Sequence, residues 1–398
     1  MESDRAFRYI FELAEMLVKQ EGSDLFITAG SSPGLKVKGV IKRVGNAPLT
    51  GEQADFLVRS IMSDKQAKMF DESNEANFAL HFKDMARFRV SAFKQRGTSG
   101  MVLRLIRSHI PSFDELHLPP MLRELAMTKR GLIMFVGATG AGKTTSLAAM
   151  IDYRNEQAPG HIITIEDPIE FFHRHKKCII NQREVGADTN SYHIALKNTL
   201  RQAPDVILIG EVRDREAMEQ AIAFAETGHL VLTTLHANNA DQAFDRILNF
   251  FPDEKRAQLL MELSFNMRAF VSQRLVPRSD IEGLIPAVEV LVNTPLVSEL
   301  IFQGRIREIK EAMSRANEEG LITFDQSLFR LYEEQFIDYQ TALRHADSVN
   351  NLRLMIKLKS KHAAPPELSD TMAKVDIDRS GDEEMYGIGH VAAPRSRG

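Results

Sequence analysis

The sequence predicts an α/β protein whose main domain is a doubly wound parallel sheet. Between about residues 121 and 277, short apolar segments typical of buried strands alternate with segments of helical pattern. A glycine-rich loop directly follows the first of these strands and leads into a helix, an arrangement that aims a helix N-terminus at a phosphate group. A smaller α+β domain is expected before this region, and helices are expected after it.

The glycine-rich loop fits the phosphate-loop pattern G-x-x-x-x-G-K-[ST] at every position. The apolar strand 131–136 precedes it, and the run of helix formers 146–151 follows it. Its glycines are expected to adopt positive φ and to turn backbone N–H groups toward phosphate oxygens. Lys143 is expected to reach the β- and γ-phosphates, and Thr144 to bind Mg²⁺. The predicted nucleotide-binding residues are Gly137, Ala138, Thr139, Gly140, Ala141, Gly142, Lys143, Thr144 and Thr145.

Five regions are predicted along the chain. The first combines helical spacing of apolar residues, a helix over 52–70 and alternating strand patterns, and a proline-containing linker follows it. In the last region apolar residues thin out among Pro, Asp, Ser and Gly, so we expect disorder there. The regions are 1–107 (small α+β domain), 108–120 (linker), 121–277 (nucleotide-binding core), 278–361 (helical region) and 362–398 (disordered tail).

The composition limits the cellular compartment and the binding partners that we expect for this chain. The chain has 398 residues with 50 Lys and Arg against 54 Asp and Glu, so the net charge of −4 gives no reason to expect nucleic acid. The single cysteine, Cys178, excludes an intramolecular disulfide and an all-cysteine metal site, as is typical of a reducing cytosol. No apolar run approaches the roughly 18 residues of a membrane span. We therefore expect a cytoplasmic protein that contacts membranes only through partners.

Carboxylates are expected at the ends of strands beside the phosphate loop, because cleavage of a γ-phosphate needs neutralised charge and an in-line water. The strand 162–165 runs into Glu166, and the strand 206–209 runs through Gly210, where a Walker B motif commonly has Asp, into Glu211. Because the carboxyl ends of parallel strands face the ligand, both glutamates should converge on Mg²⁺ and the attacking water. We assign Glu166 as general base and Glu211 as the Mg²⁺-side carboxylate, with exchanged roles as one alternative and helix N-capping as the other.

Four further side chains are candidates for catalysis. His236 ends an apolar segment and could sense the loss of the γ-phosphate, although a histidine there can also be structural. Arg89, Arg96 and Arg104 lie in the N-terminal region, far along the chain from the phosphate loop. Their spacing favours the solvated face of a β-surface, and the alternative is delivery of positive charge to a phosphoryl group held by another subunit.

Taken together, these segments resemble the secretion-ATPase superfamily, and within it the type IV pilus retraction ATPases of the PilT/PilU group. The similarity covers about residues 5–355. It rests on four motifs, namely 137–145 (Walker A), 163–171 (Asp box), 204–211 with Arg213 (Walker B) and 228–236 (His box). The resemblance implies a homohexameric ring of PAS-like N-terminal and RecA-like C-terminal domains, in which ATP hydrolysis drives pilus depolymerisation through an inner-membrane platform protein. It also implies that the three arginines reach a neighbouring subunit's nucleotide.

Three features bear on the branch within this group. Pilus assembly ATPases usually carry a four-cysteine zinc site, which one cysteine cannot build, so the sequence favours retraction. The segment 245–252 and the acidic tail are more similar to PilU than to PilT. The segment 296–310 departs from the corresponding part of the PilT branch, so the chain either retracts pili unaided or assists a PilT-like paralogue.

Other functions stay open at the level of sequence. A related motor for pilus assembly, protein secretion or nucleic-acid translocation would share the same core. A translocase would need basic residues along its pore, and the sequence has no obvious basic run. A regulatory subunit without useful turnover is disfavoured because Lys143, Thr144, Glu166 and Glu211 are all present.

Overall fold

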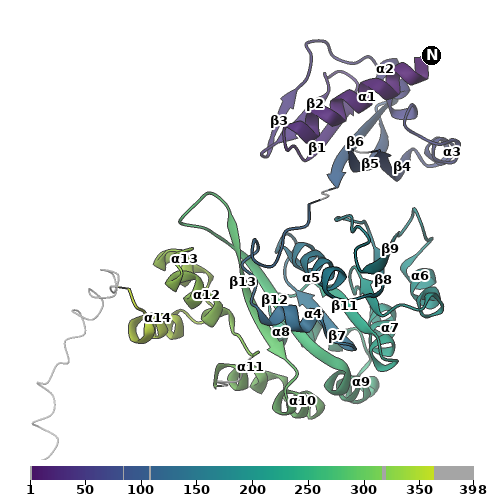
Figure 1. Ribbon diagram of the computed structural model, residues 1–398. Coiled ribbons are helices and arrows are strands. Elements are labelled where there is room, and N and C mark those ends of the chain that lie inside the picture. The colour runs from purple at the N-terminus through teal and green to yellow at the C-terminus, as the bar shows by residue number, and fades with distance from the viewer. Residues whose placement is uncertain (1, 84, 107–108, 316–319, 363–398) are drawn as a thin grey trace, which may run out of the picture.

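Two separate β-sheets organise the chain, and each has its own hydrophobic core (Figure 1). The computed structural model describes residues 2–83, 85–106, 109–315 and 320–362. The predicted fold class is confirmed, because a small α+β domain precedes a larger, mostly parallel α/β sheet and helices follow it. The tail predicted to be disordered lies outside the described residues from residue 363 onward.

The N-terminal domain is a six-stranded sheet covered by helices. Its strands lie in the order β3-β2-β1-β6-β5-β4, and all neighbours are antiparallel. Ile10 of α1 and Val58 of α2 pack with Phe88 and Val90 of β5 in one cluster. The elements are α1 (Glu2–Lys19), β1 (Asp24–Thr28), β2 (Gly34–Val37), β3 (Val40–Arg43), α2 (Gly51–Arg59), α3 (Asp64–Ser73), β4 (Glu75–Phe82), β5 (Ala86–Gln95) and β6 (Thr98–Ile106).

The single helix predicted over 52–70 is wrong, because this stretch forms two helices, α2 and α3. Ser63 begins the second one: its hydroxyl accepts a hydrogen bond from the Gln66 N–H, and the Gln66 side chain accepts one from the Ser63 N–H. This reciprocal capping box satisfies two N–H groups that a helix start otherwise leaves free, so it favours a new helix there.

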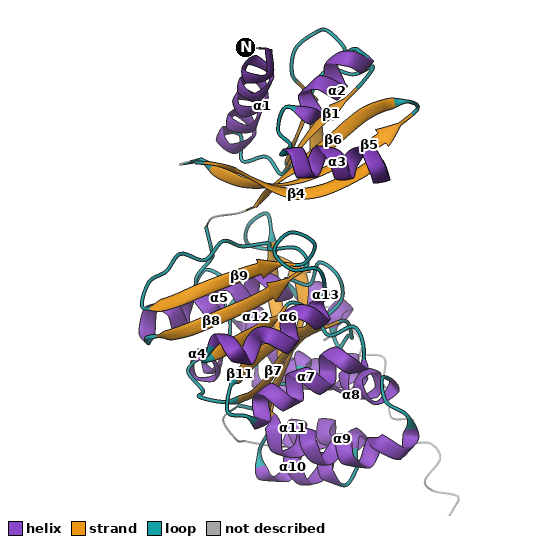
Figure 2. Ribbon diagram, turned by 90° about the vertical axis from the view of Figure 1, so that its right-hand side faces the viewer, coloured by secondary structure: helices purple, strands orange, loops and turns teal. Residues whose placement is uncertain are grey.

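The larger sheet has seven strands in the order β13-β12-β7-β11-β10-β8-β9. All its neighbours are parallel except β12 and β13, and helices cover both faces, with α6 and α7 in front and α5 behind in the view of Figure 2. The elements are α4 (Met121–Ala126), β7 (Gly131–Val136), α5 (Lys143–Gln157), β8 (Gly160–Glu166), β9 (Cys178–Glu184), α6 (Tyr192–Thr199), β10 (Val206–Ile209), α7 (Arg215–Glu226), β11 (Leu230–Leu235), α8 (Ala240–Asn249), α9 (Asp253–Asn266), β12 (Met267–Pro277) and β13 (Leu284–Val292).

The central strand β7 is buried along its whole length because it has a core on each side. Leu132 and Met134 face the cluster formed with α7, α8 and α9, whereas Ile133 and Phe135 face the cluster formed with α4 and α5. A strand buried on both faces reads as a continuous apolar run, as this one does. The strand thereby holds the phosphate loop, which follows it, at the centre of the sheet's carboxyl edge.

The helical region begins later than predicted. We expected helices from residue 278, but β13 pairs antiparallel with β12 and belongs to the large sheet, so the first helix after it starts at Pro295. The described part of the predicted linker, residues 109–120, has no helix or strand, yet it buries Phe113 and Leu118 against the same core as α5. The C-terminal helices are α10 (Pro295–Phe302), α11 (Ile306–Arg315), α12 (Phe324–Glu333), α13 (Tyr339–His345) and α14 (Val349–Lys359).

Polar contacts attach these helices to the sheet. The buried Ser327 of α12 accepts a hydrogen bond from the Val288 N–H at 2.9 Å, and Asp347 forms an ion pair with Arg274 of β12 at 2.7 Å. Burial acts to raise the pKa of Asp347, but hydrogen bonds and charge from Lys310 and Arg274 outweigh it and hold this pKa below its usual value. Across the described residues, we find no helix with the length and apolar character needed to cross a lipid bilayer.

Candidate nucleotide site

The loop between β7 and α5 takes the shape expected of a phosphate loop, with one difference. Gly140 and Gly142 adopt φ of 78° and 84°, a region that favours glycine. Gly137 does not adopt positive φ, so that part of the expectation is wrong. A Cβ on Gly137 would instead lie 2.7 Å from the carbonyl oxygen of Gln273 in β12. The first glycine is therefore required by the close approach of a neighbouring strand.

Lys143 is the first residue of α5, and its side chain lies inside the loop. Its Nζ donates hydrogen bonds to the carbonyl oxygens of Gly137 at 2.7 Å and Ala138 at 2.9 Å. Burial lowers the pKa of Lys143, while the charges of Glu211 and Glu170 act in the opposite direction. A buried cation at a helix N-terminus attracts anions, so the loop is suited to bind phosphate.

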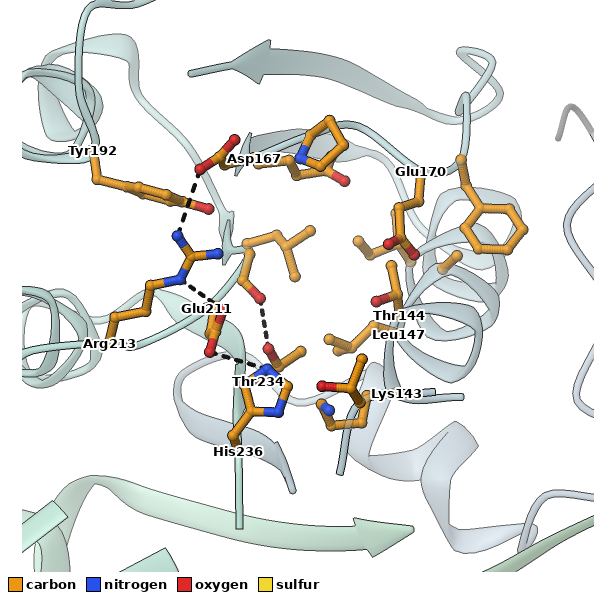
Figure 3. Close-up of a pocket in the computed structure, with 18 of the residues that line it drawn as sticks. Lys143, Thr144, Leu147, Asp167, Glu170, Tyr192, Glu211, Arg213, Thr234 and His236 are labelled. Atoms are coloured by element: carbon orange, nitrogen blue, oxygen red, sulfur yellow. Dashed lines mark hydrogen bonds and ion pairs between the residues drawn. The ribbon is translucent and has the colours of Figure 1, made fainter. Parts of the chain in front are cut away.

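A cavity of about 230 Å³ beside the loop brings the predicted catalytic residues together. Figure 3 shows Lys143 and Thr144 on one side of it and Glu211 and His236 on the other. Glu166, at the end of β8, also lines it. The lining includes Thr139, Gly140, Lys143, Thr144, Leu147, Glu166, Asp167, Glu170, Tyr192, Gly210, Glu211, Arg213, Thr234 and His236. Gly137, Ala138, Ala141 and Gly142 complete the loop, and Thr145 lies in the first turn of α5.

Glu166 is almost fully buried, with 6% of its surface exposed. Its Oε1 accepts hydrogen bonds from the Thr164 hydroxyl at 2.6 Å and the Gln182 amide at 3.1 Å. Burial raises the pKa of Glu166 to about 7, against the lowering effect of these two donors. A carboxyl group with a pKa near neutrality exchanges protons readily under physiological conditions, as a general base must.

Glu211 lies at the centre of a charged network after β10. Its Oε1 lies 3.2 Å from His236 Nε2, and its Oε2 accepts a hydrogen bond from Arg213 Nε at 2.7 Å. Arg213 also lies 3.5 Å from Asp167 Oδ2, and its hydrogen bond to Glu211 raises its own pKa. Burial lowers the pKa of His236, and Lys143 acts in the same direction. The network ties the ends of β8, β10 and β11 together across the cavity.

Gly210 stands where related motifs commonly carry Asp, and the structure explains the glycine. A Cβ there would lie 2.9 Å from the Tyr192 hydroxyl and 3.2 Å from the Ile165 carbonyl oxygen. Burial raises the pKa of the Tyr192 phenol, which keeps it neutral beside these acids. The space that an aspartate would need is thus filled by Tyr192, and Glu211 is the first acidic side chain after this strand.

The three arginines of the N-terminal domain lie elsewhere. Arg89 and Arg104 are cross-strand partners on β5 and β6, and Arg104 Nε donates a hydrogen bond to Asp24 Oδ1 at 2.8 Å. Arg96 is exposed in the turn between the same strands, with φ of 46°. None of the three lines the cavity formed by this chain's described residues. Their placement fits a solvated face, and it leaves contact with another subunit open.

Three residues of the site were missed at the level of sequence. Glu170 lies in the loop after β8, and Tyr192 is the first residue of α6; both line the cavity. Gln273 lies in β12 and contacts the phosphate loop beside the cavity. Glu170 lies within 163–171, the segment that the sequence already singles out as the Asp box, and this motif is the signal that points to it although no role was assigned to the residue. Tyr192 and Gln273 reach the site through tertiary packing alone.

The fold and the site define a phosphate-loop ATPase, and comparison with known proteins places it more closely. Residues 2–334 match the family described as Type II/IV secretion system protein, and the chain belongs to this family. It is 56% identical over 353 residues to the type IV pilus ATPase PilU of Pseudomonas aeruginosa, covering 89% of this chain and 92% of that protein. It is 39% identical to the type IV pilus retraction ATPase PilT of the same organism, covering 86% and 99%.

A solved structure supports the same placement. The chain resembles the pilus retraction motor PilT crystallised with bound ADP, with a TM-score of 0.81 and 38% identity, covering 87% of this chain and 99% of that one. The predicted membership of the PilT/PilU group and the prediction of an ATPase are therefore confirmed. The higher identity to PilU also confirms the predicted closeness to that branch.

The raised pKa of Glu166 predicts a pH-dependent effect on stability. The folded protein binds this proton more tightly than the unfolded chain, so stability is lost as pH rises from about 4.5 to about 7. The loss amounts to about 3 kcal/mol. Glu166→Gln avoids this cost, so its free energy of unfolding should gain about 3 kcal/mol on the wild type between pH 4.5 and 8. Denaturant titrations of the nucleotide-free proteins measure this difference, with Glu12→Gln, an exposed residue of α1, as the control. A pH-independent difference would contradict the raised pKa.

Proposed function

We propose that this chain is the subunit of a homohexameric, Mg²⁺-dependent ATPase ring that powers retraction of type IV pili. The observation that carries the proposal is the meeting of Lys143, Glu166, Glu211 and His236 in one cavity, in a chain 56% identical to a named type IV pilus ATPase. The ring acts at the cytoplasmic side of the inner membrane, through a pilus platform protein. It works either alone or together with a PilT-like paralogue.

Binding of ATP begins at the phosphate loop. Lys143 leaves the carbonyl oxygens of Gly137 and Ala138 for the β- and γ-phosphates, because phosphate oxygens are the stronger acceptors. The Thr144 hydroxyl and the Glu211 carboxylate are oxygen donors of the kind that Mg²⁺ prefers, and both line the cavity. Held by these two residues, Mg²⁺ would neutralise charge on the β- and γ-phosphates. Arg213 holds the Glu211 carboxylate in place.

Hydrolysis then depends on Glu166 as the general base. Its pKa of about 7 lets it take a proton from the attacking water at neutral pH. Thr164 and Gln182 fix the orientation of its carboxyl group. The exchanged assignment, with Glu211 as the base, is less favoured because both partners of Glu211, Arg213 and His236, are basic side chains, whereas the two partners of Glu166 are neutral.

His236 connects the state of the site to the next element. His236 directly follows β11 and contacts Glu211, which follows β10. It lies four residues before the start of α8. When the γ-phosphate leaves, the charge balance around Glu211 changes, and the His236 contact can transmit that change to α8. The movement of one domain against the next is the step that performs work on the pilus.

The arginines act on a neighbouring subunit's nucleotide. The outer face of β5 and β6 presents Arg89 and Arg104 side by side, and the Arg104 side chain is 66% exposed. Arg96 projects from the adjoining turn. Asp24 supplies one carboxylate to this cluster of three like charges, so a further anionic partner such as a triphosphate stabilises it.

A mixing experiment tests this contribution of the arginines between subunits. Rings made only of Arg104→Ala subunits should hydrolyse ATP on the order of 10³-fold more slowly than wild type. Mixed with Lys143→Ala subunits, which bind no nucleotide productively but keep Arg104, they should regain measurable ATPase activity. Arg43→Ala, an exposed residue of β3, is the matched control. Mixtures that stay inactive at every ratio would contradict catalysis in trans.

Pilus retraction in cells tests the proposed function itself. A strain lacking this gene should regain its full retraction when it carries the wild-type chain, but not when it carries Glu166→Gln, because the variant keeps the fold and loses the base. The same pair of strains without the PilT-like paralogue separates an independent motor from an assisting one. Equal rescue by Glu166→Gln, or no retraction defect in either background, would reject the proposal.

A further inference from the structure

Two buried polar residues interrupt the apolar strand β12. Ser272 is fully buried and Gln273 is 2% exposed, although Phe270 and Val271 before them are core residues. β12 is the parallel neighbour of β7, and Ser272 pairs with Val136, the last residue of β7. Gln273 therefore lies level with the start of the phosphate loop. A buried amide side chain is costly unless its hydrogen bonds are satisfied.

Gln273 satisfies both ends of its amide on the phosphate loop and the helix that follows it. Its Nε2 donates a hydrogen bond to the Ala141 carbonyl oxygen at 2.8 Å. Its Oε1 accepts one from the Ser146 hydroxyl in the first turn of α5, also at 2.8 Å. The side chain thus bridges the loop and the first turn of α5 from the neighbouring strand.

Two glycines of the phosphate loop, Gly137 and Gly142, lie close against Gln273. A Cβ on Gly142 would lie 2.6 Å from Gln273 Nε2, and a Cβ on Gly137 would lie 2.7 Å from the Gln273 carbonyl oxygen. The backbone and the side chain of Gln273 therefore make close contact with both ends of the loop. Gly137 is needed to admit the backbone of Gln273, and a side chain at Gly142 would displace the Gln273 amide.

The hydrogen bond from Gln273 to the Ala141 carbonyl oxygen also determines the direction of the next N–H group in the loop. In a trans peptide the C=O and the following N–H point in opposite directions. Because the Ala141 carbonyl is held by Gln273, the N–H of Gly142 points away from β12, toward the side on which phosphate oxygens bind. We infer that Gln273 is a positioning residue, which orients the amides of the phosphate loop for the nucleotide from the adjacent strand. This inference rests on the nucleotide site proposed above.

Nucleotide affinity of the variant Gln273→Met tests the inference. Methionine keeps the length and the unbranched shape but removes both hydrogen bonds, so the Kd for Mg-ADP and the KM for ATP should rise about tenfold. Ser146→Ala removes one of the two bonds and should have a smaller effect. Adding Ser146→Ala to Gln273→Met should cause no further loss, because the two residues act through one contact.

The control is Ser327→Ala, which removes a buried hydroxyl that accepts one hydrogen bond, from the Val288 N–H, away from the phosphate loop. This variant should leave KM and Kd unchanged. If Gln273→Met does not fold, Gln273→Glu replaces it, since it keeps the acceptor for Ser146 but cannot donate to Ala141 when ionised. Wild-type Kd and KM in the folded Gln273 variant, even with a lower Tm, would overturn the inference. Wild-type protein that binds no nucleotide would overturn the proposed site as well.

Discussion

The pairing of β7 with β11 on one side and β12 on the other fixes the position of every group at the site. Val136, the last residue of β7, is level with Leu235 of β11 and Ser272 of β12. The phosphate loop therefore begins where both neighbours present their next side chains, His236 and Gln273. Because β10 and β8 continue the parallel order, Glu211 and Glu166 reach the same edge. One register places a cation, two carboxylates and a histidine around one cavity.

Much of this arrangement could be predicted from the sequence, because it follows from continuous apolar runs. Four parallel strands carry apolar runs, and in β8, β10 and β11 the first ionisable side chain after the run marks the end of that strand. The carboxyl ends of parallel strands lie at the same edge of the sheet, so these side chains come together. Glu166, Glu211 and His236 were found in this way, and Lys143 by the glycine pattern. The local chain also gave the capping signal at Ser63, which a reading based on apolar spacing alone overlooked.

The rest depends on contacts between distant segments. β12 carries Ser272 and Gln273 in its buried middle, so its sequence does not resemble that of a core strand. Neither β12 nor β13, which pairs with it, was predicted as a strand. The reason for Gly210 lies in Tyr192, 18 positions earlier in the chain, whose hydroxyl occupies the space of a Cβ. The pKa of Glu166 likewise depends on burial that no single segment supplies. For the arginines, the contact that we propose lies with another subunit, so this chain's own sequence and fold do not reveal it.

If Lys143 holds the nucleotide and Glu166 catalyses its hydrolysis, one paired measurement on two variants separates binding from catalysis. Affinity for Mg-ATP and steady-state hydrolysis are determined side by side for Lys143→Ala and Glu166→Gln. Lys143→Ala should weaken binding by about two orders of magnitude, since a charge-assisted contact is lost. Glu166→Gln should bind like the wild type but hydrolyse at least ~100-fold more slowly. Wild-type hydrolysis by Glu166→Gln would contradict the assignment of Glu166 as the base.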